Sequence, residues 1–101
     1  MVRRVVWSNQ ADWIFTKILD FYIERNGSKT YSQKLNNEVL SIITILSKQP
    51  FLGIKTDTKN LRVIIKGDLK IFYQIEMEEL TIHLVWDCRQ SSKSLNINLK
   101  Y

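Results

Sequence analysis

Residues 61–75 read LRVIIKGDLKIFYQI, two apolar runs on either side of the pair Gly67-Asp68. The apolar residues in both runs are mostly β-branched or aromatic and recur with a period near two, which is typical of a half-buried β-strand. Gly followed by Asp between two such runs indicates a tight turn. The stretch therefore predicts an antiparallel hairpin with strands at 61–66 and 69–76.

The pairing register of this hairpin decides which side chains share a face. A loop of Gly67-Asp68 alone pairs Ile65 with Lys70 and mixes polar and apolar residues on both faces. A loop of three residues, 66–68, makes one face almost wholly apolar, so we expect the three-residue loop. The expected partners are Ile65 with Leu69, Val63 with Ile71, and Leu61 with Tyr73.

Two further strands are expected around this hairpin. The run Leu80–Trp86 alternates most cleanly and follows a short acidic turn, Met77-Glu78-Glu79. Connections this short force the three consecutive strands to be antiparallel neighbours. Near the N-terminus, Arg3–Trp7 is a short run of β-branched and aromatic residues that suits another strand.

The chain between these strands has the periodicity of two helices. Ser8-Asn9 offers N-caps and Gly27 a C-terminal stop, which predicts a helix over 9–26. Ser28 or Thr30 can cap a second helix, with the spacing of a capping box, and Pro50 ends it. The expected apolar stripes are Ala11, Ile14, Phe15, Ile18, Leu19 and Tyr22, then Tyr31, Leu35, Val39, Ile42, Ile43 and Leu46.

The element order predicts an α+β fold, β-α-α-β-β-β, with a helical hairpin packed on one face of a small antiparallel sheet. A chain of 101 residues suits one domain of ordinary size. We expect a single domain over 1–101, with its core at about 3–90 and a polar C-terminal tail at 91–101.

The chain holds one cysteine, Cys88, and one histidine, His83. A single cysteine forms no internal disulfide, and this pair is too small for a zinc site of the usual Cys/His kind. No run approaches the ~20 apolar residues of a membrane span, and the N-terminal apolar run is shorter than a signal peptide requires. We expect a cytoplasmic protein without a cofactor, a metal or a membrane partner.

Fifteen Lys and Arg against ten Asp and Glu give a net charge of +5. Cations beside an aromatic ring on the sheet face that the helices leave open would suit RNA, whereas apolar side chains among them suit a protein partner. A plain solvated face is the third interpretation. The residues expected on this face or at its edge are Arg62, Ile64, Lys70, Phe72, Gln74, His83, Val85 and Arg89.

An ordered set of segments resembles the RelE/ParE superfamily of bacterial type II toxin–antitoxin toxins, over about 5–95. The segments are Trp7-Ser8-Asn9-Gln10-Ala11, Pro50-Phe51-Leu52-Gly53, Leu61-Arg62, the strand 70–75 and Val85-Trp86-Asp87-Cys88-Arg89-Gln90. The resemblance implies a toxin held inactive by a cognate antitoxin in a hetero-oligomer. RelE-like members cleave messenger RNA on the ribosome, whereas ParE-like members poison DNA gyrase.

The resemblance to the nucleases is partial when it is followed residue by residue. Arg62, Lys70 and Arg89 stand at or near basic positions, and they are the catalytic candidates if the chain is a ribonuclease. His83 and Tyr101 are weaker candidates for proton transfer.

The expected C-terminal tyrosine or histidine of the nucleases has no clear counterpart. Leu95 falls near that position, and Ser92 replaces a common proline. The pattern favours a ParE-like toxin with DNA gyrase as its target. A RelE-like endoribonuclease acting on ribosome-bound mRNA is the alternative, and a non-toxic RNA-binding domain is a further one.

Overall fold

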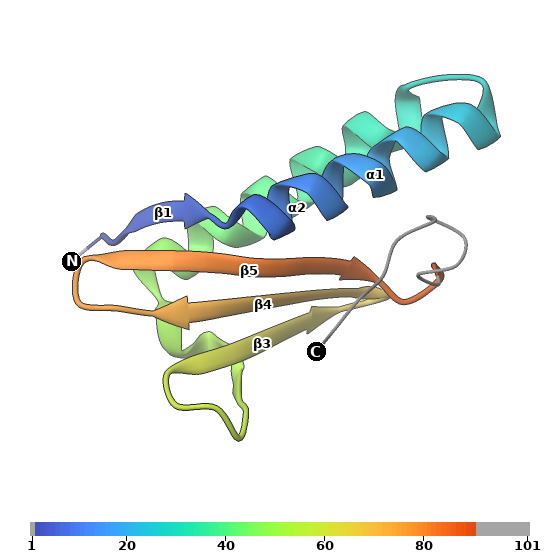
Figure 1. Cartoon of the computed structure of the whole chain (residues 1–101). Helices are drawn as coiled ribbons and strands as arrows, with labels where there is room; N and C mark the ends of the chain where they lie inside the picture. Colours follow the sequence, from blue (N-terminus) through green and yellow to red (C-terminus); the bar gives the residue numbers. More distant parts are fainter. Residues whose placement is uncertain (1, 91–101) are drawn as a thin grey trace.

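The computed structural model describes residues 2–90. Within this range the structure has a five-stranded sheet with the strand order β1-β5-β4-β3-β2. A helical hairpin, α1 and α2, lies on one face of this sheet (Figure 1). The predicted α+β fold with a helical hairpin on a sheet is confirmed. The elements are β1 Arg4–Trp7, α1 Asn9–Asn26, α2 Thr30–Lys48, the 3-10 turn η1 Pro50–Leu52, β2 Ile54–Lys55, β3 Leu61–Lys66, β4 Leu69–Ile75 and β5 Glu79–Asp87. The tail expected at 91–101 lies outside the described residues.

Helix α1 has the predicted bounds because both of its ends are capped. The Ser8 hydroxyl accepts a hydrogen bond from the Ala11 amide at 3.0 Å. At the other end Gly27 takes a left-handed conformation with φ 65° and donates its amide to the Ile23 carbonyl at 2.9 Å. Glycine adopts this conformation without the steric cost that a Cβ would bring.

Helix α2 begins at Thr30 without the predicted capping box. Lys29 occupies the N-cap position and makes no side-chain cap. The Ser28 hydroxyl accepts only a long contact of 3.4 Å from the Thr30 amide. The start of α2 is instead tied to α1, since the Ser32 hydroxyl donates to the Leu19 carbonyl at 2.7 Å.

The sheet holds two features that the sequence did not predict. Strand β1 pairs in parallel with β5, with Val5 opposite Leu80 and Trp7 opposite Ile82. After α2, the turn η1 leads into β2, a strand of two residues that pairs with β3. Strand β1 itself was predicted, but its composition does not identify the strand that it pairs with. Strand β2 is shorter than the windows in which periodicity is visible.

The predicted hairpin register is wrong by one residue. Ile65 pairs with Lys70, Ile64 with Ile71 and Arg62 with Tyr73, so the loop is Gly67-Asp68 alone. Gly67 has φ 59° and Asp68 does not have a positive φ. Glycine at the first of two loop residues is the requirement of a type II′ turn, which matches the twist of the strands. The turn preference outweighs the segregation of polar and apolar residues, because β3 is only half-buried.

Three residues predicted for the open face, the sheet surface opposite the helices, lie on the other face. Arg62 and Ile64 face the helical side, since their partners on β4 are buried there. Val85 joins them because the β4–β5 pairing shifts between Phe72 and Tyr73. Such a bulge interrupts the alternation and leaves two consecutive β5 residues, Leu84 and Val85, buried.

The core lies between the hairpin and the sheet. Both predicted helical stripes contribute to it, together with alternate residues of β4 and the buried apolar residues of β5. Leu19 and Tyr31, the exceptions within those stripes, are only partly buried at its border. The buried members are Ala11, Ile14, Phe15, Ile18, Tyr22, Leu35, Val39, Ile42, Ile43, Leu46, Leu69, Ile71, Tyr73, Ile75, Leu80, Ile82, Leu84 and Val85.

Tyr73 links this core to the segment after α2. Its side chain is fully buried, and its hydroxyl donates to the Pro50 carbonyl at 2.6 Å. The same oxygen accepts from the Gly53 amide at 2.9 Å. A Cβ on Gly53 would lie 2.4 Å from that oxygen, so only glycine fits here. Burial raises the pKa of Tyr73, which keeps its hydroxyl protonated as the donor.

Removing this bridge should destabilise the fold in two separable steps. We expect Tyr73→Phe to cost about 1–3 kcal/mol, because it leaves the Pro50 carbonyl and the Gly53 amide without their partner. We expect Tyr73→Ala to cost about 3–5 kcal/mol, because it also opens a cavity. Urea denaturation measures both values. The control is Ile65→Ala, which should lower the free energy of unfolding by less than about 1 kcal/mol because Ile65 is half-exposed. A Tyr73→Phe protein as stable as wild type would contradict the role of the bridge.

Candidate functional site

Four of the eight residues predicted for the open face lie on it. Strand β4 alternates between buried residues and the half-buried Lys70, Phe72 and Gln74, which point away from the helices. His83 on β5 joins them, since its Nε2 lies 2.8 Å from Oε1 of Gln74. These four residues are one cation, one ring and one polar pair, and Trp86 of β5, opposite Lys70, adds a second ring to the open face.

Strand β3 adds an apolar row beside these residues. Leu61 pairs with Gln74, Val63 with Phe72 and Ile65 with Lys70, so all three lie on the open face. Ile65 is 49% exposed. A surface with few cations, Lys70 and the Glu79-paired Arg4 of β1, among apolar side chains is suited to a protein partner more than to a phosphate chain, which needs several cations.

Arg62 lies on the other face, at the edge formed by η1 and β2. Its Nη1 donates to the Gly53 carbonyl at 2.8 Å and to the Phe51 carbonyl at 3.3 Å. Its guanidinium also lies over the Phe51 ring, 5.1 Å from the ring centre. Arg62 therefore holds the chain between α2 and β2 in place.

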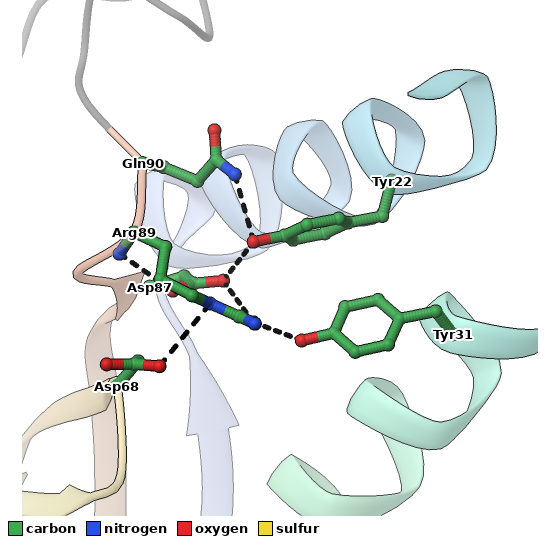
Figure 2. A network of polar contacts seen from close by, with 6 residues as sticks. All are labelled: Tyr22, Tyr31, Asp68, Asp87, Arg89 and Gln90. Atoms are coloured by element: carbon green, nitrogen blue, oxygen red, sulfur yellow. Dashed lines mark hydrogen bonds and ion pairs between the residues drawn. The ribbon is translucent and has the colours of Figure 1, made fainter. Parts of the chain in front are cut away.

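Arg89 lies where β5 ends, inside a polar network drawn in Figure 2. Its Nη2 donates to Oδ2 of Asp87 at 2.9 Å and to the Tyr31 hydroxyl, and its Nε donates to Oδ1 of Asp87 at 3.1 Å. A longer ion pair of 3.5 Å joins it to Asp68 on the hairpin loop. The guanidinium is thus bound to one buried carboxylate and oriented by the tyrosine.

Asp87 is the centre of this network and has no exposed surface. It accepts a hydrogen bond from the Tyr22 hydroxyl at 2.6 Å and one from the Arg89 amide at 3.0 Å. Gln90 completes the network by donating to the Tyr22 hydroxyl at 2.9 Å. The network joins the end of β5 to α1 and α2.

Burial alone would raise the pKa of Asp87, but the hydrogen bonds from Arg89 and Tyr22 outweigh it and hold that pKa below its usual value. The bonds to Asp87 and Tyr31 raise the pKa of Arg89. Burial and the bond to Asp87 raise the pKa of Tyr22. At neutral pH the network therefore consists of a carboxylate, a guanidinium and a protonated phenol.

The three predicted cations are separated in the structure. Lys70 lies on the open face, Arg62 on the opposite face and Arg89 at the end of β5 beside Asp87. Tyr101, like Leu95 and Ser92, lies outside the described residues. Stabilising a pentavalent phosphate requires donors that converge on one point, and these cations do not converge.

Three further findings concern other kinds of site. Among residues 2–90, no cluster of three or more His, Cys, Asp and Glu side chains is placed to hold a metal ion. No helix in this range is long and apolar enough to cross a membrane. The thiol of Cys88 is exposed.

Two groups of interacting residues were not predicted. The first is the bridge from Tyr73 to Pro50 and Gly53. The segment Pro50-Phe51-Leu52-Gly53 contributed to the family resemblance, but nothing in it indicated a contact with Tyr73. The second is the Asp87 network, for which the Asp-x-Arg spacing at the end of a strand was the available signal. Both depend on tyrosine hydroxyl groups. Periodicity predicts that these tyrosines are buried in the core, but it does not predict which groups their hydroxyls bind.

The chain has a helical hairpin over a mostly antiparallel sheet, and its family match identifies it as a toxin of the RelE/ParE superfamily. Within that superfamily, the family described as "ParE toxin of type II toxin-antitoxin system, parDE" matches residues 5–91. Because the match spans most of the chain, the chain belongs to the ParE toxin family.

A solved structure supports the fold independently. The structure described as "Chromosomal ParDE TA system from P. aeruginosa" is similar to this one with a TM-score of 0.72. The match covers 85% of this chain and 96% of that chain at 13% sequence identity, so it establishes the fold alone. A search of curated proteins found no match.

The lowered pKa of Asp87 predicts how stability depends on pH. Since the folded pKa lies below the ordinary value of 3.8, the unfolded chain binds more protons, and the contribution of Asp87 is lost as the pH falls through the folded pKa. We expect Asp87→Asn to cost about 1.5–3 kcal/mol near neutral pH, because charge-assisted hydrogen bonds are weakened.

Urea denaturation of wild type and Asp87→Asn from about pH 7 to about pH 3 checks this expectation. The difference between the two proteins should shrink as the pH falls below the ordinary aspartate pKa. The exposed Asp57→Asn is the matched control and should show little difference at any pH. A pH-independent cost of Asp87→Asn would contradict the assignment.

Proposed function

We propose that this chain is the growth-inhibiting toxin of a type II toxin–antitoxin module, and that it acts in the cytoplasm on DNA gyrase by binding. The observation that carries the proposal is the separation of Arg62, Lys70 and Arg89 over two faces and one end of the sheet. Membership of the ParE toxin family supports the same conclusion.

Cleavage of RNA by these cations would require them to contact one phosphate. Arg62 is bound to backbone carbonyls of the segment after α2, and Arg89 is bound to the buried Asp87. Releasing Arg89 would leave a buried carboxylate without its cation, which is strongly unfavourable. Of the candidates for catalysis, only Lys70 and His83 then remain on the open face, and His83 lies within hydrogen-bonding distance of Gln74.

The open face is the surface that we propose for contact with a protein partner. It combines Lys70, Phe72, Gln74 and His83 with the half-exposed Ile65. Rings and apolar side chains bordered by a cation are typical of a protein interface. The cognate antitoxin and the gyrase target are the two proposed partners, and an antitoxin that covers this face would keep the toxin inactive in a hetero-oligomer.

The choice of target can be tested directly with purified protein. We expect the chain to inhibit supercoiling by DNA gyrase and, when expressed alone, to cause gyrase-dependent DNA damage and growth arrest. Co-expression of the protein encoded beside it should relieve the arrest. Toeprinting on translated messenger RNA is the second measurement. Cleavage of ribosome-bound message with unchanged supercoiling would contradict the proposal and support a RelE-like ribonuclease.

The role of the open face can be tested by reversing one charge. We expect Lys70→Glu to abolish growth arrest, because it places a carboxylate among groups that contact the partner. The exposed Lys34→Glu on α2 makes the same change of net charge away from this face and should remain toxic. The free energy of unfolding of both variants should lie within about 0.5 kcal/mol of the wild-type value. If Lys70→Glu remained fully toxic, the open face would not be part of the functional site.

A further inference from the structure

Three large apolar side chains are exposed next to one another in the chain where α2 leads into β2. Phe51 is 64% exposed, Leu52 53% and Ile54 61%. Phe51 and Leu52, which line one hollow together, form with Gly53 a surface that we name the Phe51 platform, whereas Ile54 pairs with Val63 and lies on the open-face side of the sheet. Apolar side chains gathered on a surface are unfavourable in water and mark sites of interaction.

The backbone of the Phe51 platform is held firmly despite this exposure. Tyr73 binds the Pro50 carbonyl and the Gly53 amide, and Arg62 binds the Phe51 and Gly53 carbonyls. The ring of Phe51 also lies against the Arg62 guanidinium. A side chain presented on a fixed backbone loses little conformational entropy when a partner covers it, so it binds more strongly.

Two hollows flank Phe51, and cations line both of them. The hollow toward β3, of about 430 Å³, is lined by Lys55, Lys59 and Arg62, with Asp57 as its one carboxylate. The hollow toward α2, of about 480 Å³, is lined by Arg3 and Lys48. Five cations against one carboxylate favour a partner that carries acidic side chains.

We propose that the Phe51 platform binds an amphipathic, acidic segment of the cognate antitoxin, with apolar side chains against Phe51 and Leu52 and carboxylates toward the flanking cations. This inference rests on the proposed function and adds a second contact surface, because the platform is built around Arg62 on the side of the sheet opposite Lys70. The antitoxin is the occupant, since a neutralising partner needs slow dissociation and rigid apolar anchors supply it.

The test compares two aromatic side chains that both lie beside a cation. Phe51→Ala removes the platform ring, and Trp13→Ala removes a 51% exposed ring on α1 that lies under Lys17 and lines neither hollow. The purified protein encoded beside this chain is the probe. Its dissociation constant is measured by calorimetry at low and high salt, and toxicity of each variant is measured without that protein.

We expect Phe51→Ala to weaken binding about 30-fold, the effect of losing an interface hot spot, and to stay toxic when expressed alone. Trp13→Ala should bind within about twofold of wild type. Lys55→Glu should also weaken binding, more at low salt than at high salt, because exposed charges are screened.

Unchanged binding by Phe51→Ala would overturn the inference while leaving the proposed function intact. Loss of toxicity with unchanged binding would also overturn it, because the platform would then serve the target. A wild-type chain that arrests growth but does not bind the neighbouring protein would overturn the antitoxin as occupant. A wild-type chain that neither arrests growth nor binds that protein would overturn the proposed function and this inference together.

Discussion

The hydroxyl of Tyr73 is the interaction on which the arrangement of this molecule depends. It lies in the core, yet it donates to Pro50 and accepts from Gly53, so a single oxygen sets the path of the chain between the helices and the sheet. That path places the Phe51 carbonyl where Arg62 reaches it. The position of an exposed surface is thus decided by a buried hydrogen bond, and Gly53 is required because a side chain would occupy the position of the hydroxyl.

Electrostatics explains why a basic domain of this kind need not be a nuclease. The net charge of +5 describes the chain as a whole, but function depends on whether cations meet at one point. Arg89 is paired with a buried carboxylate and Arg62 supports a turn, so both have structural roles. The surfaces that remain combine apolar side chains with scattered cations, which is the composition of an interface with another protein.

The fold could be predicted from the sequence wherever local signals agreed with one another. The Ser8 and Gly27 caps predicted both ends of α1, and apolar periodicity predicted the core stripes of both helices. Pairing in the β3–β4 hairpin could not be predicted from segregation of side chains, because the glycine of a II′ turn decided it. The β-bulge that moved Val85 has no signal in the sequence, since it depends on how β5 packs against β4.

The candidate site was predicted in part for the same reasons. Lys70, Phe72, Gln74 and His83 lie on the open face as expected, because either register leaves alternate residues of β4 there. The prediction for Arg62 and Ile64 followed the wrong register and was wrong about their face. Contacts between residues distant in sequence, such as that of Arg62 with Gly53, require the three-dimensional path of the chain and have no periodic pattern.

Parallel pairing of β1 with β5 has a consequence for synthesis on the ribosome. Residues 4–7 pair with residues 79–82, so β1 has no partner until almost the whole domain has been translated. Contacts this distant in sequence form late and slow the folding of small domains. A nascent chain therefore carries α1 and α2 without a finished sheet, and neither the open face nor the Asp87 network exists before β5 emerges. The folded domain, with both of these features, therefore forms only after β5 has been translated.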